Sequence, residues 1–277
     1  MTRQDRIYRS TRIIAAIVIP FLLLAILILY FFPEQTGERF AWPINPTITA
    51  MLLAAAYGGG VYFFGSVLLS RRWHTVKAGF LPVTVFAGLL GIATLLHWER
   101  FTHGHIAFIL WATLYFTTPF LVFAAWLNNR REDPGLTEET GPMLSSGWRV
   151  FFSLQALATI VLSLFFFVFP AVMISIWPWQ LTPLTARVMG AMFAIPGVLG
   201  ILIAFDPRWG TAKRLLEAQT LSFGMILVAY LRARADFFTT EGVYWVFVLS
   251  TILILAALML IFVQMRARRQ ARVRINQ

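Results

Sequence analysis

The feature that most constrains this chain is a succession of apolar runs, each about twenty residues long, separated by short polar stretches. A helix of that length spans the hydrocarbon core of a bilayer, since it rises about 1.5 Å per residue. The composition agrees, because 59% of the residues are hydrophobic and only 13% are charged, with a mean hydropathy of +0.74. Soluble domains average about half apolar and a quarter charged residues. The sequence therefore predicts an all-α, polytopic membrane protein.

The loops between the apolar runs predict how the chain crosses the membrane. We expect eight transmembrane helices, over residues 12–32, 47–70, 78–98, 105–127, 150–176, 184–205, 212–231 and 243–265. With eight crossings, the loops and termini on one side carry 18 Lys and Arg residues and those on the other side carry five. Because short cytoplasmic loops hold an excess of cations, this bias predicts a protein of the plasma (inner) membrane with both termini in the cytoplasm.

An internal duplication relates the two halves of the chain. Arg12 and Pro33 stand 21 residues apart across the first apolar run, and Arg149 and Pro170 stand 21 residues apart across the fifth. Two further pairs of segments correspond: Trp42-Pro43 with Trp177-Pro178, and Arg72-Trp73-His74-Thr75-Val76-Lys77 with Arg208-Trp209-Gly210-Thr211-Ala212-Lys213. Self-similarity at a nearly constant offset is the signature of a repeated structural unit.

Two repeats of four helices each follow from this duplication. Because four is an even number, both repeats begin on the same side and lie parallel, related by an axis along the membrane normal. We predict the first four-helix repeat at 1–127, a mobile cytoplasmic linker at 128–148, and the second repeat at 149–277. The second repeat ends in a basic tail, Arg266 to Arg274, that we expect to lie on anionic lipid.

Glycine and proline interrupt the second and sixth predicted helices at corresponding positions. Tyr57-Gly58-Gly59-Gly60 lies in the second helix and Pro196-Gly197 in the sixth. Paired interruptions of this kind predict a ligand site at the interface of the repeats, because an interrupted helix can offer backbone groups to a ligand. The alternative is close helix packing, which small residues also permit.

Glu217 is the only carboxylate inside a predicted transmembrane helix. Lys213 stands four residues before it, so one interpretation is an ion pair at the level of the lipid headgroups. The other is a coupling or gating role beside the ligand site. Charges are otherwise nearly absent from the predicted helices, and each would cost roughly 2.5–3.5 kcal/mol at mid-membrane. We therefore expect a neutral, apolar or lipid-like ligand.

Three of the four histidines lie in one predicted outer hairpin. His97, Glu99, His103 and His105 could bind Zn²⁺ or Cu²⁺, or the imidazoles could bind haem, although a hydrated polar turn also explains them. The plan of four plus four helices resembles that of the haem A synthases, whose haem ligands are histidines within even-numbered spans. Here His105 alone approaches such a position, and spans two, six and eight contain no histidine.

The duplicated motif after the second and sixth helices places cations and tryptophan where lipid headgroups lie. We predict headgroup anchors on the anionic side of the bilayer, and a pair of phosphate-binding clamps is the alternative. The residues are Arg72, Trp73, Lys77, Arg208, Trp209 and Lys213. The net charge of +11 then reflects membrane topology, and no nucleic-acid partner is expected.

Three hypotheses for function remain open from the sequence. The first is transport or binding of a neutral, apolar or lipid-like molecule at the repeat interface. The second is a non-catalytic structural subunit of a larger membrane complex, which would have membrane-protein partners. The third is a membrane metal- or haem-binding protein that uses the histidine hairpin. The absence of cysteine excludes thiol catalysis, and we identify no catalytic residue and no cofactor motif.

Overall fold

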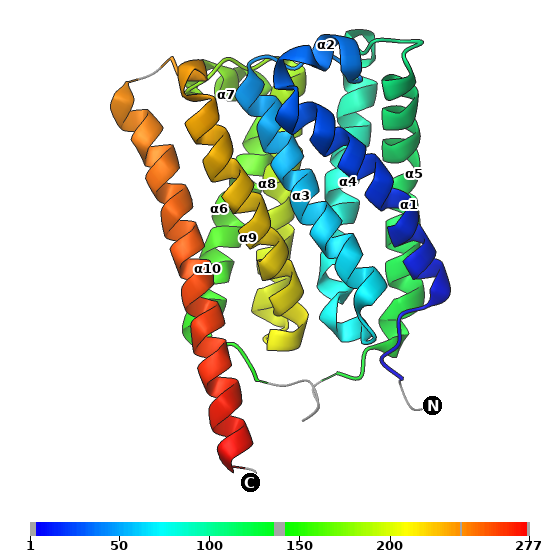
Figure 1. Cartoon of the computed structure of the whole chain (residues 1–277), viewed down its shortest axis with the longest axis vertical. Coiled ribbons are helices and arrows are strands. Elements are labelled where there is room, and N and C mark those ends of the chain that lie inside the picture. Colours follow the sequence, from blue (N-terminus) through cyan, green and yellow to red (C-terminus); the bar gives the residue numbers. More distant parts are fainter. Residues whose placement is uncertain (1–3, 136–141, 239, 276–277) are drawn as a thin grey trace.

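The computed structural model describes residues 4–135, 142–238 and 240–275, and the described part of the chain contains helices but no strand. The long helices stand side by side in one bundle (Figure 1). They are α1 (Arg9–Ile26), α3 (Thr47–Leu69), α4 (Phe80–Leu96), α5 (Ile106–Asn129), α6 (Ser146–Val168), α8 (Pro183–Phe205), α9 (Trp209–Arg232) and α10 (Glu241–Ile275). Two short helices, α2 (Thr36–Arg39) and α7 (Pro170–Ile176), lie at one end.

The first and last described residues lie at the same end of the bundle, which we call the termini end (Figure 1). It also holds the connections 70–79 and 206–208 and the described residues 130–135 and 142–145. The opposite end, which we call the far end, holds the connections 32–46, 97–105 and 177–182 and the residues 233–238. Helix α10 continues ten residues past its predicted end at 265, so the start of the expected basic tail is helical.

Seven of the described helices are long and apolar enough to cross a membrane. This finding supports an all-α, multi-pass membrane protein. The predicted span 212–231 does form a helix, α9, but α9 is not one of the seven. Its first turns carry Lys213, Arg214 and Glu217, which lower its hydropathy. The count of eight crossings therefore stays a prediction.

Proline explains where two predicted spans change direction. The span expected at 150–176 divides into α6 and α7, and the break falls between Phe169 and Pro170. Helix α1 ends in a π-helical turn, Leu27–Phe31, just before Pro33. Proline has no amide hydrogen and its ring clashes with the preceding turn, so it is well suited to the start of a helix, the position that Pro170 takes in α7.

The helices of the two halves pack in matching pairs. Helix α1 packs on α3, and α6 packs on α8. Helix α4 contacts α5, and α9 contacts α10. Between the halves, α3 packs on α9, and α8 packs on α4. The bundle is therefore held together by contacts between the first and second half as well as within each.

Corresponding arginines make corresponding hydrogen bonds at the termini end. The guanidinium of Arg12, in α1, donates to the carbonyls of Leu68 and Ser70 at the end of α3, at 2.6 Å for Ser70. The guanidinium of Arg149, in α6, donates to the carbonyl of Ala204 at the end of α8, at 2.9 and 3.0 Å. Both arginines thus satisfy carbonyl groups that a helix leaves unpaired in its last turn.

The segments that precede α1 and α6 also make matching backbone contacts. The amide of Trp73 donates to the carbonyl of Asp5 at 2.8 Å, and the amide of Trp209 donates to the carbonyl of Pro142 at 3.0 Å. Each segment therefore lies against the connection that follows α3 or α8.

Glycines allow three of these helix pairs to approach closely. A Cβ atom built on Gly200, in α8, would lie 2.6 Å from the carbonyl oxygen of Phe152 in α6. A Cβ atom on Gly59, in α3, would lie 3.2 Å from the carbonyl oxygen of Ala218 in α9. A Cβ atom on Gly91, in α4, would lie 2.9 Å from the carbonyl oxygen of Tyr115 in α5. The small residues here serve helix packing.

A single methyl group at Gly200 should separate α6 from α8. We expect Gly200→Ala to lower the free energy of unfolding by about 1–3 kcal/mol, because the backbone of α6 must move. The measurement is unfolding of the purified protein in detergent. Gly224→Ala is the matched control, since nothing lies within 4 Å of a Cβ atom there, and it should be neutral or stabilising by up to about 1 kcal/mol. Equal effects of the two changes would refute the close approach.

Candidate cavity between the halves

A cavity of about 320 Å³ lies in the middle of the bundle. Its walls come mainly from α3, α8 and α9, and α1, α4, α5 and α10 each contribute a few residues. Helices α3 and α4 belong to the first half of the chain and α8 and α9 to the second, so the cavity lies between the halves. Its volume is at the lower end of the range for small-molecule sites, about 300–1,000 Å³.

The wall of the cavity is apolar and carries no formal charge. Among the described residues, no Lys, Arg, Asp, Glu or His lines it. Aromatic and sulfur-containing side chains make up much of the surface, among them Phe63, Phe64, Phe86, Met189, Met192 and Phe193. Such a surface favours apolar molecules, because transferring apolar area out of water contributes about 25 cal/mol per Å².

Four of the residues predicted for the ligand site line this cavity. They are Tyr57, Gly59, Gly60 and Pro196. The sequence therefore identified parts of α3 and α8 that face each other across the interface of the halves. Their role in binding a ligand stays a prediction.

The other residues predicted for the ligand site do not line the cavity. A Cβ atom on Gly58 would meet Met225 of α9, and a Cβ atom on Gly197 would lie 2.7 Å from Ile160 of α6. Helix packing accounts for both glycines. The glycine and proline motifs were expected to interrupt their helices and offer backbone groups to a ligand. They do not interrupt them, because α3 and α8 are each continuous through these motifs.

Glu217 is held by three neighbours near the termini end. The hydroxyl of Tyr62 donates to its Oε2 atom at 2.6 Å, and Arg214 contacts the same oxygen at 3.1 Å. The ammonium of Lys213 lies 3.7 Å from Oε1. The predicted ion pair with Lys213 is thus present, and the sequence reasoning missed the two closer partners.

The residues that line the cavity from the first half of the chain are more buried than those that line it from the second half. The lining residues on α1 and α4 are nearly all buried, whereas Phe193 and Pro196 on α8 and Ile226 on α9 are half-buried. Ser250 on α10 lines the cavity and is exposed. Among the described lining residues, the exposed one therefore lies on α10.

The few polar groups of the cavity include tyrosines that the sequence reasoning did not single out together. Tyr57 and Tyr115 join through their hydroxyls at 2.7 Å, and both side chains are buried. Tyr230 also lines the cavity and is buried. A signal was available for the first two, because Tyr57 and Tyr115 lie in the middle of predicted spans, away from the interfacial level where membrane proteins concentrate tyrosine.

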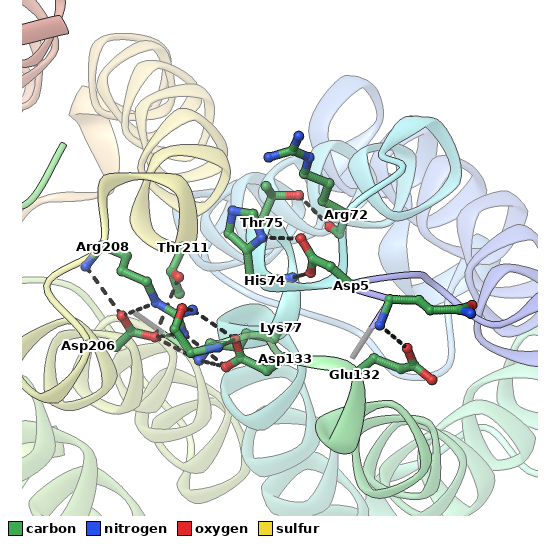
Figure 2. Close-up of polar contacts among 12 residues, drawn as sticks. Asp5, Arg72, His74, Thr75, Lys77, Glu132, Asp133, Asp206, Arg208 and Thr211 are labelled. Carbon is green, nitrogen blue, oxygen red and sulfur yellow. Dashed lines mark hydrogen bonds and ion pairs between the residues drawn. The ribbon is translucent and has the colours of Figure 1, made fainter. Parts of the chain in front are cut away.

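A network of ion pairs joins both halves to the linker at the termini end (Figure 2). Arg208 contacts Asp133 of the linker at 2.7 Å and Asp206 at 2.6 Å. Lys77 pairs with the same two carboxylates, at 2.7 Å for Asp206. The linker is thus anchored at Asp133, although it was expected to be mobile. Residues 136–141 of the predicted linker lie outside the described residues.

The network changes the pKa values of its members. Burial alone would raise the pKa of Asp206, but hydrogen bonds from Arg208 and Lys77 outweigh it and lower that pKa to about 2. Burial would also raise the pKa of Asp133, but hydrogen bonds from Arg208 and Lys77 outweigh it and hold that pKa well below the usual range. The two carboxylates in turn raise the pKa of Arg208 despite its burial. Asp133, Asp206 and Arg208 are therefore charged near neutral pH.

The predicted lipid-headgroup anchors lie mostly inside the protein. Trp73 is fully buried and Trp209 is 9% exposed, so neither indole can extend into a headgroup layer. Lys77 and Arg208 belong to the ion-pair network. The duplicated motif thus fixes the two loops to the bundle, because its aromatic members pack in the core and its cations meet carboxylates.

Two of the six predicted anchors keep an outward position. Arg72 is exposed, and the side chain of Lys213 is 42% exposed. Contact with anionic lipid stays a prediction for these residues. It also stays a prediction for the basic tail. The side chains of residues 269 and 271–275, and the whole of residues 276–277, lie outside the described part of the chain.

The histidine hairpin does not gather its side chains around one point. Among the described residues, no group of three or more His, Cys, Asp or Glu could hold a metal ion. His97 contacts Arg187 of α8 at 2.6 Å, and burial and the nearby arginines lower its pKa. His103 contacts the carbonyl of Trp98 at 3.0 Å, and His105 accepts from the amide of Ala107 at 3.2 Å.

Each imidazole therefore has a structural partner of its own. Glu99 lies in the 3₁₀ turn Trp98–Arg100 between the first and second of these histidines. The metal and haem hypotheses for His97, Glu99, His103 and His105 gain no support from this arrangement.

Comparison with known proteins gives no relative for this chain. No protein-family model, no curated protein and no solved structure matches it. The fold and the cavity are therefore the basis for the proposals below.

The ion-pair network should make stability depend on pH in the acid range. The folded pKa of Asp206, about 2, is below its ordinary value of 3.8, so its contribution is complete above pH 4 and is lost as the pH falls through 2. At pH 7 we expect Asp206→Asn to lower the free energy of unfolding by about 1–3 kcal/mol, because Arg208 loses a charged partner. Detergent-solubilised protein unfolded at pH 7, 5 and 3 provides the measurement.

The matched control is Glu241→Gln at the far end. Glu241 pairs with Arg234, and its side chain is 71% exposed, so its loss should cost less than about 0.5 kcal/mol. The difference between wild type and Asp206→Asn should shrink toward pH 3. A difference that stays constant with pH would contradict the role assigned to the carboxylate.

Proposed function

We propose that this protein binds or transports a neutral, apolar or lipid-like small molecule in the cavity between its two halves. The observation that carries the proposal is an uncharged, largely apolar cavity enclosed by helices from both halves of the chain. Seven helices suited to crossing a membrane place this cavity in an integral membrane protein. Ligand sites between helices of a bundle are a common arrangement.

We infer further that the two halves are parallel repeats of four helices, with 1–127 and 149–277 as units. The repeated sequence motifs, the matching helix pairs and the matching hydrogen bonds of Arg12 and Arg149 support this arrangement. The position of α9 among the other long helices supports it as the eighth crossing (Figure 1). Its three charged residues near the termini end fit a position at the headgroup level.

The charge distribution supports a neutral ligand. The described cations and carboxylates lie toward the two ends of the bundle, and the cavity wall has no group that could neutralise an ion. Placing an unpaired charge there would cost several kcal/mol. The exposed lining residue Ser250 favours the side of α10 as the route of entry from the hydrocarbon of the bilayer.

The proposal is tested by filling the cavity. Ile226 lines it from α9, and Ile226→Trp should reduce binding of tritiated decane by about tenfold. A tenfold loss is expected if the larger side chain keeps two methylene groups of decane out of the cavity, because burial of each contributes about 0.8 kcal/mol. Binding is measured on protein in lipid nanodiscs, after subtraction of the decane held by protein-free nanodiscs.

The matched control is Val228→Trp on the same helix. Val228 is 45% exposed and does not line the cavity, so the added indole should leave decane binding unchanged. Native mass spectrometry of protein extracted gently from its own membrane then identifies a retained molecule. Absence of saturable decane binding in the wild type, or equal loss in both variants, would refute the proposal.

A further inference from the structure

Three buried tyrosines are among the residues that line the cavity. We call Tyr57, Tyr115 and Tyr230 the cavity tyrosines; they come from α3, α5 and α9. Their exposed fractions are 2%, 3% and 7%. Because buried hydroxyls normally have hydrogen-bond partners, their bonding in this apolar environment indicates what else the cavity can hold.

The hydroxyl pair of Tyr57 and Tyr115 leaves one hydrogen unused. The two oxygens lie 2.7 Å apart, and either of them could be the donor. Each phenol has one O–H donor, so one hydrogen is shared within the pair and the other is available. Among the residues described by the structure, neither hydroxyl makes another hydrogen bond.

Tyr230 has an even clearer deficit. Its side chain packs against aromatic rings, with centroids 5.8 Å away at Phe247 and 6.0 Å away at Phe237. Within the described part of the chain, no hydrogen bond satisfies its hydroxyl. Its hydroxyl keeps some accessible surface, because it is not among the described polar atoms that are both fully buried and without a partner. A ligand oxygen in the cavity would accept its hydrogen.

We propose that the cavity tyrosines select a ligand that carries an uncharged oxygen, as a hydroxyl or a carbonyl group, on an apolar body. A hydroxyl or carbonyl oxygen accepts the available phenolic hydrogen, and the rest of the molecule occupies the apolar volume. A hydrocarbon without oxygen leaves the phenols unsatisfied. This inference rests on the proposed function, since it names the class of molecule that the same cavity takes.

The position of the tyrosines adds to the description of the ligand. Tyr57 is ten residues from the start of α3 and Tyr115 nine from the start of α5, so both lie about 15 Å from the far end at 1.5 Å per residue. Tyr230 is two residues from the end of α9, at the far end. The cavity continues toward the termini end as far as Gly79 and Leu215. An elongated molecule therefore fits this volume.

The test compares three molecules of equal chain length. Tritiated decane, 1-decanol and 2-decanone are each bound to the full-length protein in nanodiscs, with protein-free nanodiscs subtracted. We expect the wild type to bind decanol and decanone about five- to tenfold more tightly than decane, relative to their uptake by the lipid, because one hydrogen bond is gained. Equal affinities for all three molecules would overturn the inference.

The variant removes all three hydroxyls together, as Tyr57→Phe, Tyr115→Phe and Tyr230→Phe. All must change, because removing one member of the Tyr57–Tyr115 pair leaves the other hydroxyl free to donate. The preference for oxygen should disappear, while decane binding is retained and shows that the cavity is intact. A preference that survives in this triple variant would overturn the inference.

Tyr244→Phe is the matched control, because Tyr244 is equally buried but does not line the cavity. It should keep the preference for oxygen, and a loss in this variant would count against the inference. Failure of the proposed function looks different, because decane, decanol and decanone would then all fail to bind.

Discussion

The structure depends on the lack of water in a hydrocarbon core, which obliges every backbone amide and carbonyl there to find a partner within the protein. Helices meet this requirement within each segment, so the described chain is helical throughout its long apolar runs. The requirement is hardest to meet where a helix ends. Arg12 and Arg149 meet it by donating to carbonyls at the ends of α3 and α8, and each therefore ties the start of one helix to the end of the next.

The same physical constraint separates charge from the cavity. At the termini end, Lys77, Asp133, Asp206 and Arg208 neutralise one another, and they connect the linker with both halves. This arrangement is stable because each buried charge has an opposite charge within hydrogen-bond distance. The described residues that line the cavity include no such charged partners, and their polar groups are hydroxyls and the carboxamide of Gln219. The protein can accordingly fix its two halves by ion pairs at one end and keep an uncharged volume between them.

Hydrophobic run length predicted the helical class and the approximate bounds of the helices, because length and apolarity are set by the bilayer and not by tertiary packing. It could not decide the status of α9, whose charged first turns reduce the hydropathy while the helix still packs against α3. The glycine and proline motifs located Tyr57, Gly59, Gly60 and Pro196 on the cavity wall. Sequence could not reveal that Trp73 and Trp209 turn inward, since an indole near a span end is equally suited to lipid and to a core. Nor could it reveal the carboxylates Asp133 and Asp206 that meet Lys77 and Arg208, because Asp133 reaches them from a linker far away in sequence.

For the proposed ligand, buried hydroxyls would provide a selectivity that a fully apolar cavity lacks. A hydrocarbon cavity offers little discrimination against the acyl chains of the surrounding lipid, because each methylene contributes about the same free energy in either environment. A phenolic hydrogen without a partner changes that balance, since an oxygen-bearing molecule gains a hydrogen bond that an acyl chain cannot form. The gain is largest where no water competes, which is the environment around Tyr57, Tyr115 and Tyr230. In the proposed ligand site, selectivity would therefore come from a few buried hydroxyls, and the apolar wall would supply most of the affinity.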